Sequence, residues 1–109
     1  MARDVHAEIR DEIARNKIMI YMKGTPIFPQ CGFSAATVKV FEQLGAPFET
    51  VDILADPEKR QAIKDFSNWP TIPQVYVDGK FIGGCDIVME MFERGELKSV
   101  VEATKTAAS

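Results

Sequence analysis

A single thiol stands where a helix is predicted to begin. Cys31 opens the segment Cys31-Gly32-Phe33-Ser34, which follows a loop with prolines at positions 26 and 29. A cysteine at a helix N-terminus lies beside unpaired backbone N–H groups and the positive end of the helix dipole, and both favour the thiolate. Ser34 is able to hydrogen-bond a sulfur but not to form a disulfide with it. The segment therefore has the spacing of a redox Cys-x-x-Cys pair whose second thiol is missing.

The second cysteine, Cys85, follows two glycines and precedes Asp86 at the start of another predicted helix. Its sulfur is either an inert filler of a tight turn or a thiol that pairs with Cys31 on oxidation, and in both cases its backbone is free to bind a ligand. For Cys31 the alternative is an inert buried cysteine, against which the preceding loop and the helix start argue. Two distant cysteines in a chain of this length are typical of a reducing compartment.

Length and composition favour one domain over residues 1–109, because 109 residues with 46% hydrophobic content are enough to bury a core. The net charge of −3 gives no basic surplus, so nucleic acid and anionic membrane surfaces are poor candidate partners. Residues 1–8 carry acids and lack the apolar run of a secretory signal. The apolar stretch over 18–22 is too short to span a bilayer. We therefore expect a cytoplasmic protein, although a processed organellar form would have the same sequence.

The first half of the chain has alternating helix and strand patterns. Val5, Ile9 and Ile13 recur every four residues between charges, which predicts an amphipathic helix that Asp4 is able to cap. The continuous apolar run that follows is typical of a strand covered on both faces. The expected elements are a helix over 4–15, a strand over 17–22, a helix over 32–44 that Gly45 ends, and a strand over 48–54.

The second half predicts a helix, a hairpin and two further helices. Asp56-Pro57 starts the first of these helices, with Ala62, Ile63 and Phe66 as its buried face. The expected elements are that helix, a Pro-broken loop over 67–73, strands over 74–77 and 80–82 joined by an Asp78-Gly79 turn, a helix from about 85 to Gly95, a helix around 97–101, and a frayed tail over 104–109. This order predicts an α/β protein with a four-stranded mixed sheet flanked by helices, which is the thioredoxin fold.

Four segments carry a resemblance to a known family. They are Lys23-Gly24-Thr25-Pro26, Cys31-Gly32-Phe33-Ser34, Trp69-Pro70-Thr71-Ile72-Pro73-Gln74 and Gly83-Gly84-Cys85-Asp86. In this order and spacing the chain resembles the single-domain monothiol glutaredoxins of the Cys-Gly-Phe-Ser type. The resemblance implies a glutathione site and a bridging [2Fe-2S] cluster that a homodimer holds. A [2Fe-2S] cluster takes four thiolates, so two copies of Cys31 and two glutathione thiolates complete the set.

The resemblance also implies a role for individual residues around the glutathione. Lys23 and Arg60 match the cations that hold its glycyl carboxylate. Without the resemblance, both would be interpreted as solvated surface residues. Thr71 and Ile72 match the residues whose backbone pairs with its cysteinyl part, ahead of a proline, Pro73, that is cis in the family.

Cys85 and Asp86 match the pair at the γ-glutamyl end, where a glycine-led helix start offers N–H groups and Asp86 is able to receive the ammonium. Asp86 also suits the N-cap of its own helix, and one residue is able to serve both purposes.

The expected function is that of a glutathione-dependent carrier, which accepts a [2Fe-2S] cluster from an assembly scaffold and passes it to client apoproteins. The resemblance further implies a BolA-type protein as a heterodimer partner. An alternative is a weak monothiol oxidoreductase, in which the Cys31 thiolate attacks a glutathionylated substrate and a second glutathione resolves the intermediate. A third interpretation is a thioredoxin-fold interaction module without chemistry.

Overall fold

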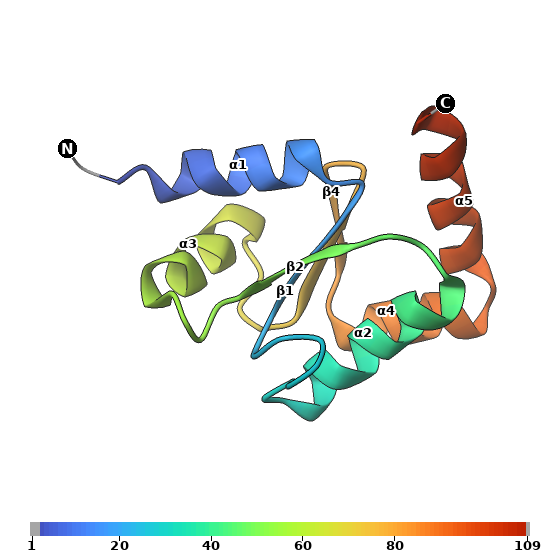
Figure 1. The fold of residues 1–109 in the computed structure, drawn as a ribbon, viewed down its shortest axis with the longest axis horizontal. Helices are drawn as coiled ribbons and strands as arrows, with labels where there is room; N and C mark the ends of the chain where they lie inside the picture. The colour runs from blue at the N-terminus through green and yellow to red at the C-terminus, as the bar shows by residue number, and fades with distance from the viewer. Residues whose placement is uncertain (1–2, 109) are drawn as a thin grey trace.

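The computed structural model describes residues 3–108 and the side chains as far as Thr104. Helices and strands follow one another in the order that the sequence predicts (Figure 1). They are α1 (Val5–Arg15), β1 (Ile18–Met22), α2 (Gly32–Leu44), β2 (Glu49–Asp52), α3 (Pro57–Ser67), β3 (Gln74–Val77), β4 (Lys80–Gly83), α4 (Cys85–Glu93) and α5 (Glu96–Ala108). No helix in this part of the chain is long and apolar enough to cross a membrane.

The four strands form one mixed sheet in the order β2-β1-β3-β4. Strand β1 pairs with β2 in parallel and with β3 antiparallel, so it lies in the middle of the sheet. Strands β3 and β4 form the predicted hairpin, in which Asp78 and Gly79 have φ values of 56° and 82°. Positive φ at both central residues is what a type I′ turn requires. The predicted α/β class and thioredoxin fold are confirmed.

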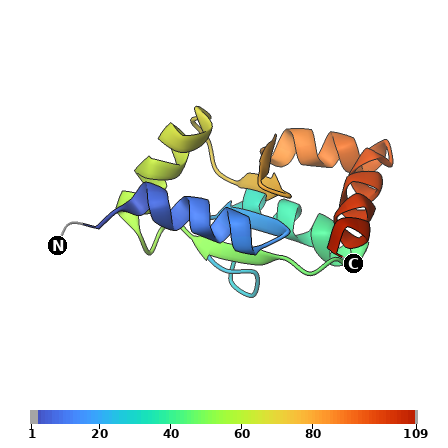
Figure 2. The same cartoon turned by 90° about the horizontal axis from the view of Figure 1, so that it is seen from above.

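Helices cover both faces of the sheet (Figure 1). On one face α1 and α3 pack over the sheet in a cluster that includes Ile9, Ile63, Tyr21 and Tyr76. On the other face α2, α4 and α5 build a second cluster, which includes Phe41, Val88 and Leu97 together with Ile20 and Val75. All five residues of β1 are buried, as the apolar run predicts for a central strand. Figure 2 shows α5 at the opposite end of the molecule from the start of α1.

Local signals set the ends of the helices. The Asp4 carboxylate accepts a hydrogen bond from the Ala7 N–H at 3.0 Å and caps α1. The Asp56 carboxylate accepts one from the Lys59 N–H at 3.1 Å and caps α3, with Pro57 as its first residue. Helix α2 ends at Gly45, whose φ of 69° is the left-handed conformation that glycine adopts readily.

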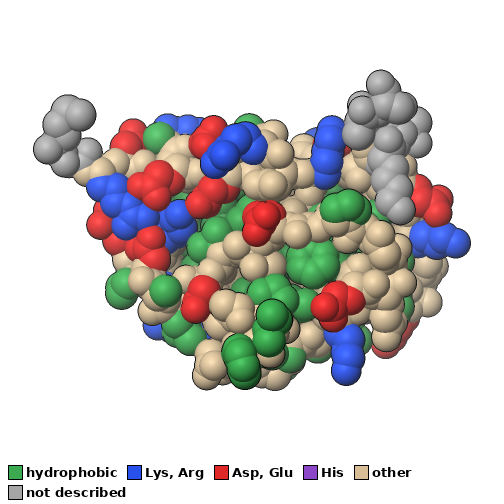
Figure 3. Space-filling view, viewed as in Figure 1, with side chains coloured by type: hydrophobic (Ala, Val, Ile, Leu, Met, Phe, Trp, Pro, Cys, Tyr) green, Lys and Arg blue, Asp and Glu red, His purple; other side chains and the backbone are tan. Residues whose placement is uncertain are grey.

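A charged cluster fastens α1 to α3. Arg3 contacts Asp56 at 2.6 Å, and Lys59 contacts Glu12 at 2.6 Å and Glu8 at 3.3 Å. The Lys59 residue is only 6% exposed, so its ammonium depends on these carboxylates for solvation. Figure 3 shows side chains of both charges side by side at the end of the molecule where α1 begins.

Three sequence-based expectations differ from the structure. Strand β2 is shorter than the predicted 48–54. Phe66 is 37% exposed instead of buried, because it lies at the edge of the core with its ring 6.1 Å from that of Tyr76. Helix α5 continues through Ala108, and Thr104 is 4% exposed. The Thr104 hydroxyl donates to the Val101 carbonyl at 2.7 Å, which allows a polar side chain to be buried there. Fraying of the tail stays a prediction, and Ser109 lies outside the described residues.

Candidate functional site

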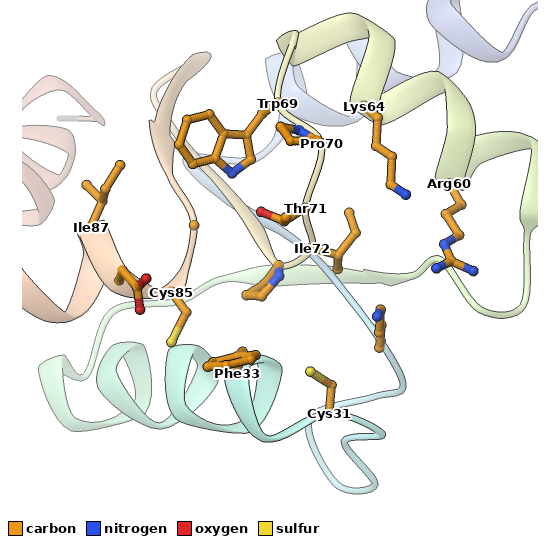
Figure 4. A pocket seen from close by; sticks show the side chains of 14 residues that line it. Cys31, Phe33, Arg60, Lys64, Trp69, Pro70, Thr71, Ile72, Cys85 and Ile87 are labelled. Atoms are coloured by element: carbon orange, nitrogen blue, oxygen red, sulfur yellow. The ribbon is translucent and has the colours of Figure 1, made fainter.

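Cys31 is the N-cap residue of α2, as predicted, and its thiol is half-buried. Its backbone is extended, with φ −154° and ψ 135°, so the chain turns into the helix directly after the thiol. The preceding loop is ordered by its own hydrogen bonds, because the Gln30 N–H donates to the Lys23 carbonyl at 2.9 Å and Gly24 pairs with Pro29. The loop and the helix together place the Cys31 side chain in the lining of a pocket of about 740 Å³ (Figure 4).

The surroundings of Cys31 lower the pKa of its thiol. The largest contribution comes from the backbone N–H of Ser34, which stabilises the thiolate, while burial acts in the opposite direction. The N–H of Phe33, the charge of Lys23 and the Ser34 hydroxyl lower the pKa further. The side chain makes no capping hydrogen bond in the structure, so these N–H groups are free to receive the thiolate. The site therefore presents a nucleophilic or metal-binding sulfur.

One end of the pocket is cationic. Lys23 follows β1, and Arg60 and Lys64 project from successive turns of α3 (Figure 4). The Nε atom of Arg60 is buried and has no hydrogen-bond partner among the described residues. A buried donor without an acceptor is unfavourable, and the carboxylate of a ligand would supply one.

The middle of the pocket is formed by the loop between α3 and β3. Thr71 and Ile72 lie on this loop, across the pocket from Cys31 (Figure 4). The Ile72–Pro73 peptide bond is cis, as the resemblance implies. Trp69 lines the pocket too, and its indole Nε1 atom is buried without a hydrogen-bond partner in the described part of the chain.

The opposite end of the pocket is the start of α4. Cys85 and Asp86 are the first two residues of this helix, and Gly84 is its N-cap. The unpaired N–H groups of a helix start attract an anion, and the Asp86 carboxylate beside them suits a cation. A Cβ atom on Gly84 would lie 3.1 Å from the Pro73 carbonyl oxygen, which explains why a glycine stands where these two segments meet. This end is therefore suited to a zwitterionic group.

The pocket brings together every residue that the sequence analysis proposed for the site. They are Cys31, Lys23, Arg60, Thr71, Ile72, Cys85 and Asp86. Their individual roles stay predictions. Among the described residues no three His, Cys, Asp or Glu side chains gather so that they could hold a metal ion.

Sequence reasoning missed three side chains that line the pocket. Lys64 lies one helical turn after Arg60, and this i,i+4 spacing was the available signal. Phe33 is 62% exposed beside Cys31. Ile87, on the first turn of α4, is 37% exposed and lines the pocket. No sequence pattern distinguishes these two apolar residues from core residues.

Comparison with known proteins identifies the class. The family model for glutaredoxin matches residues 18–82, and the chain belongs to the glutaredoxin family. It is 53% identical to the "Uncharacterized monothiol glutaredoxin ycf64-like" of Synechocystis sp., over 94% of this chain and 95% of that one. It is 48% identical to "Glutaredoxin 4" of Escherichia coli K12, over 89% and 84% of the two chains. The resemblance to the monothiol glutaredoxins is thus confirmed.

Solved structures agree with this assignment. The solution structure of reduced poplar apo GrxS14 is 44% identical, with a TM-score of 0.79 over 94% of this chain and 93% of that one. The crystal structure of a buckwheat glutaredoxin–glutathione complex is 26% identical, with a TM-score of 0.81 over 91% and 88%. The buckwheat protein therefore binds glutathione on the same fold.

Proposed function

We propose that this protein binds glutathione in its pocket and, together with the bound thiol, carries a [2Fe-2S] cluster from an assembly scaffold to client apoproteins. The main support is the thiol of Cys31, which has a lowered pKa and lies in a pocket between a cationic end and a helix start. A serine at position 34 cannot form a disulfide with this thiol, so the thiolate stays available as a ligand.

The polarity of the pocket matches that of glutathione along its length. Lys23 and Arg60 would bind the glycyl carboxylate, as cations do in charge-assisted pairs. The Thr71–Ile72 backbone would pair with the cysteinyl part in the manner of an added strand. The N–H groups of Cys85 and Asp86 would bind the γ-glutamyl carboxylate, with the Asp86 carboxylate on the ammonium. The glutathione complex of the buckwheat relative supports this assignment.

The cluster would be cargo that two chains share. A [2Fe-2S] cluster takes four thiolates, and of the two cysteines that line the pocket, Cys31 is the one proposed as a ligand. A homodimer with two bound glutathione molecules would complete the four. Because half of those ligands are exogenous, the cluster would leave more readily than from a cage of four cysteines in one chain. We also propose a BolA-type protein as a partner that replaces one protomer.

A second function is favoured by the lowered pKa of Cys31, which also suits a nucleophile. In this reaction the Cys31 thiolate attacks the glutathione sulfur of a protein–glutathione mixed disulfide. The S–S bond breaks, the protein thiolate leaves, and Cys31 carries the glutathione. The thiolate of a second glutathione then attacks that sulfur, which releases oxidised glutathione and regenerates the Cys31 thiolate.

Anaerobic reconstitution with iron and sulfide, with and without glutathione, tests the carrier function. We expect visible absorption and a dimeric mass only in the sample with glutathione. A colourless monomer in both samples would overturn the proposal. Turnover of a glutathione mixed disulfide at the rate of a dithiol glutaredoxin would favour the oxidoreductase instead.

Two cysteine variants serve as controls for this experiment. Cys31→Ser removes the proposed ligand and should abolish both cluster binding and turnover. Cys85→Ser should leave cluster binding largely intact, because the proposed contribution of Cys85 comes from its backbone N–H. Loss of the cluster in Cys85→Ser would instead assign a role to its sulfur.

A further inference from the structure

Gln74, the first residue of β3, carries a buried amide directly behind the middle of the pocket. The residue is fully buried, and its side chain makes three hydrogen bonds. The Nε2 atom donates to the Trp69 carbonyl at 3.0 Å and to the Thr71 carbonyl at 3.2 Å. The Oε1 atom accepts from the Tyr76 hydroxyl at 3.2 Å. Both amide protons are therefore committed to the loop that forms the middle of the pocket.

The orientation of this amide follows from its partners. Backbone carbonyls only accept hydrogen bonds, so the NH₂ group must face Trp69 and Thr71 and the oxygen must face Tyr76. The Tyr76 hydroxyl is buried as well, and this burial raises the pKa of Tyr76 to about 12, so it remains a donor at neutral pH. The result is a fully satisfied polar group inside an otherwise apolar cluster.

The bond to Thr71 fixes the direction of the next N–H group. In a trans peptide the carbonyl and the following N–H point in opposite directions, and the Thr71–Ile72 peptide is not among the cis bonds. With the Thr71 carbonyl held toward Gln74, the Ile72 N–H points away from Gln74. No hydrogen bond from this N–H to another described residue is found. Ile72 lines the pocket, and this unpaired N–H is therefore a candidate donor to a ligand bound there.

We propose that Gln74 is a positioning residue for the ligand site, which fixes the Thr71–Ile72 peptide plane so that its N–H is presented to the peptide backbone of the ligand. This inference rests on the proposed glutathione binding. An apolar side chain of similar size would fill the same space without the desolvation of an amide. Every hydrogen bond that the Gln74 side chain donates is made to the binding loop, and this is the reason to assign it a role beyond packing.

Binding of S-methylglutathione, which has no thiol to titrate, tests the proposal by calorimetry and by the NMR shift of the Ile72 amide proton. In the unmodified protein we expect binding and a downfield shift of this proton. Gln74→Leu removes both donors, and we expect binding to weaken at least about tenfold, the order of one lost hydrogen bond, with no downfield shift.

Val75→Ala is the matched control, because Val75 is fully buried in the same strand but belongs to the cluster on the other face. It should lower the urea midpoint and leave the dissociation constant within about twofold of the unmodified value. Equal weakening in Val75→Ala and Gln74→Leu would overturn the proposal. So would unchanged binding in Gln74→Leu while the unmodified protein binds. Absence of binding in the unmodified protein would overturn the proposed function itself.

Gln74→Glu keeps the test decisive should Gln74→Leu fail to fold. A protonated glutamic acid donates one hydrogen bond and a carboxylate donates none, and burial raises the pKa of such a carboxyl. The ratio of the variant's dissociation constant to the unmodified protein's should therefore rise between about pH 5 and about pH 8. Tyr21, opposite Gln74 in β1, and Tyr76 both have raised pKa values through burial, so neither titrates in this range. A ratio that does not change with pH would overturn the proposal.

Discussion

The Ser34 hydroxyl oxygen accepts a hydrogen bond from the backbone N–H of Lys23 at 3.1 Å. This bond joins the start of α2 to the residue that follows β1, and Ser34 is fully buried. The same hydroxyl also lowers the pKa of Cys31 by hydrogen bonding to the thiolate. The serine that replaces a second thiol thus has two structural tasks, one in holding the loop and one in stabilising the thiolate.

Ser34→Ala should therefore raise the pKa of Cys31 and lower the free energy of unfolding by about 1 kcal/mol, because the Lys23 N–H loses its acceptor. The pH dependence of alkylation by iodoacetamide reports the pKa, and urea unfolding reports the stability. Thr37→Ala is the control, since its buried hydroxyl donates to the Phe33 carbonyl at 2.9 Å. It should lose similar stability with no change in the alkylation profile, and a change there would contradict the assignment.

Gly24 and Gly32 flank the loop and should respond oppositely to alanine. A Cβ atom on Gly24 would overlap the Phe28 carbonyl oxygen and lie 2.7 Å from the Gln30 nitrogen, and the φ of Gly24 is +89°. Gly24→Ala should cost about 1–3 kcal/mol of unfolding free energy. A Cβ on Gly32 meets nothing within 4 Å, so Gly32→Ala should be neutral or stabilising by up to about 1 kcal/mol. Urea unfolding of the two variants measures the difference, and equal stabilities would refute this explanation.

Local chemistry explains why so much of the fold could be predicted. The Asp56-Pro57 start of α3 and the Asp78-Gly79 turn are determined by a few neighbouring residues, so the sequence alone was enough to place them. The burial of Thr104 and the exposure of Phe66 depend on what packs against them from distant segments. A propensity pattern contains no information about such packing, so neither the burial of Thr104 nor the exposure of Phe66 could be predicted.

The site was predictable to the extent that its residues fall in sequence motifs. Cys31 and Asp86 belong to two such segments, and the fold brings them to one pocket. Lys64 had only its spacing from Arg60 as a signal. The role of Gln74 depends on which carbonyls face its amide, and that is decided by the path of the loop in three dimensions.

The Lys59–Glu12 pair should show strong coupling. Their charged atoms lie 2.6 Å apart, and the side chains are only 8% and 18% exposed. Burial lowers the pKa of Lys59, but the hydrogen bond that its ammonium donates to Glu12 and the charges of Glu12 and Glu8 outweigh this effect and raise the pKa. Lys59→Met leaves the buried Glu12 carboxylate without its cation, and Glu12→Gln leaves Lys59 only the longer contact to Glu8 at 3.3 Å. Each change should cost about 2–4 kcal/mol.

The double variant of this pair should cost less than the sum of the two single variants, with a coupling of about 1–3 kcal/mol. A double-mutant cycle by urea unfolding at pH 7 measures it. Strictly additive effects would mean that the pair contributes nothing beyond its separate side chains.

Acid should weaken the cluster around Arg3. Hydrogen bonds from Arg3 are the main cause that lowers the pKa of Glu8 and of Asp56 to about 2 in each case. A carboxyl with a lowered pKa in the folded state adds stability above its unfolded pKa of about 4, and this stability is lost as the pH falls toward 2. Arg3→Met should therefore be less stable than the unmodified protein at pH 7, and the difference should shrink below about pH 4. Urea midpoints of both proteins between pH 7 and about pH 3 check this prediction. A stability difference that does not change with pH would contradict it.

The cationic end of the pocket should distinguish arginine from lysine at position 60. The Arg60 Nε atom is buried and has no hydrogen-bond partner among the described residues. A bound carboxylate would accept a hydrogen bond from this atom and also pair with the positive charge of the guanidinium. Arg60→Lys keeps the charge but loses the fork of donors, and should weaken S-methylglutathione binding about threefold. Arg60→Gln loses both, and should weaken binding at least about tenfold and reduce the dependence of binding on salt.

The control is Lys98→Gln, which removes an exposed cation on α5 outside the pocket. It should change neither the affinity nor its dependence on salt. Calorimetric titrations at low and high ionic strength measure the affinity and its dependence on salt. Equal affinities of Arg60→Lys and Arg60→Gln would show that the charge of Arg60 is not what binds the carboxylate.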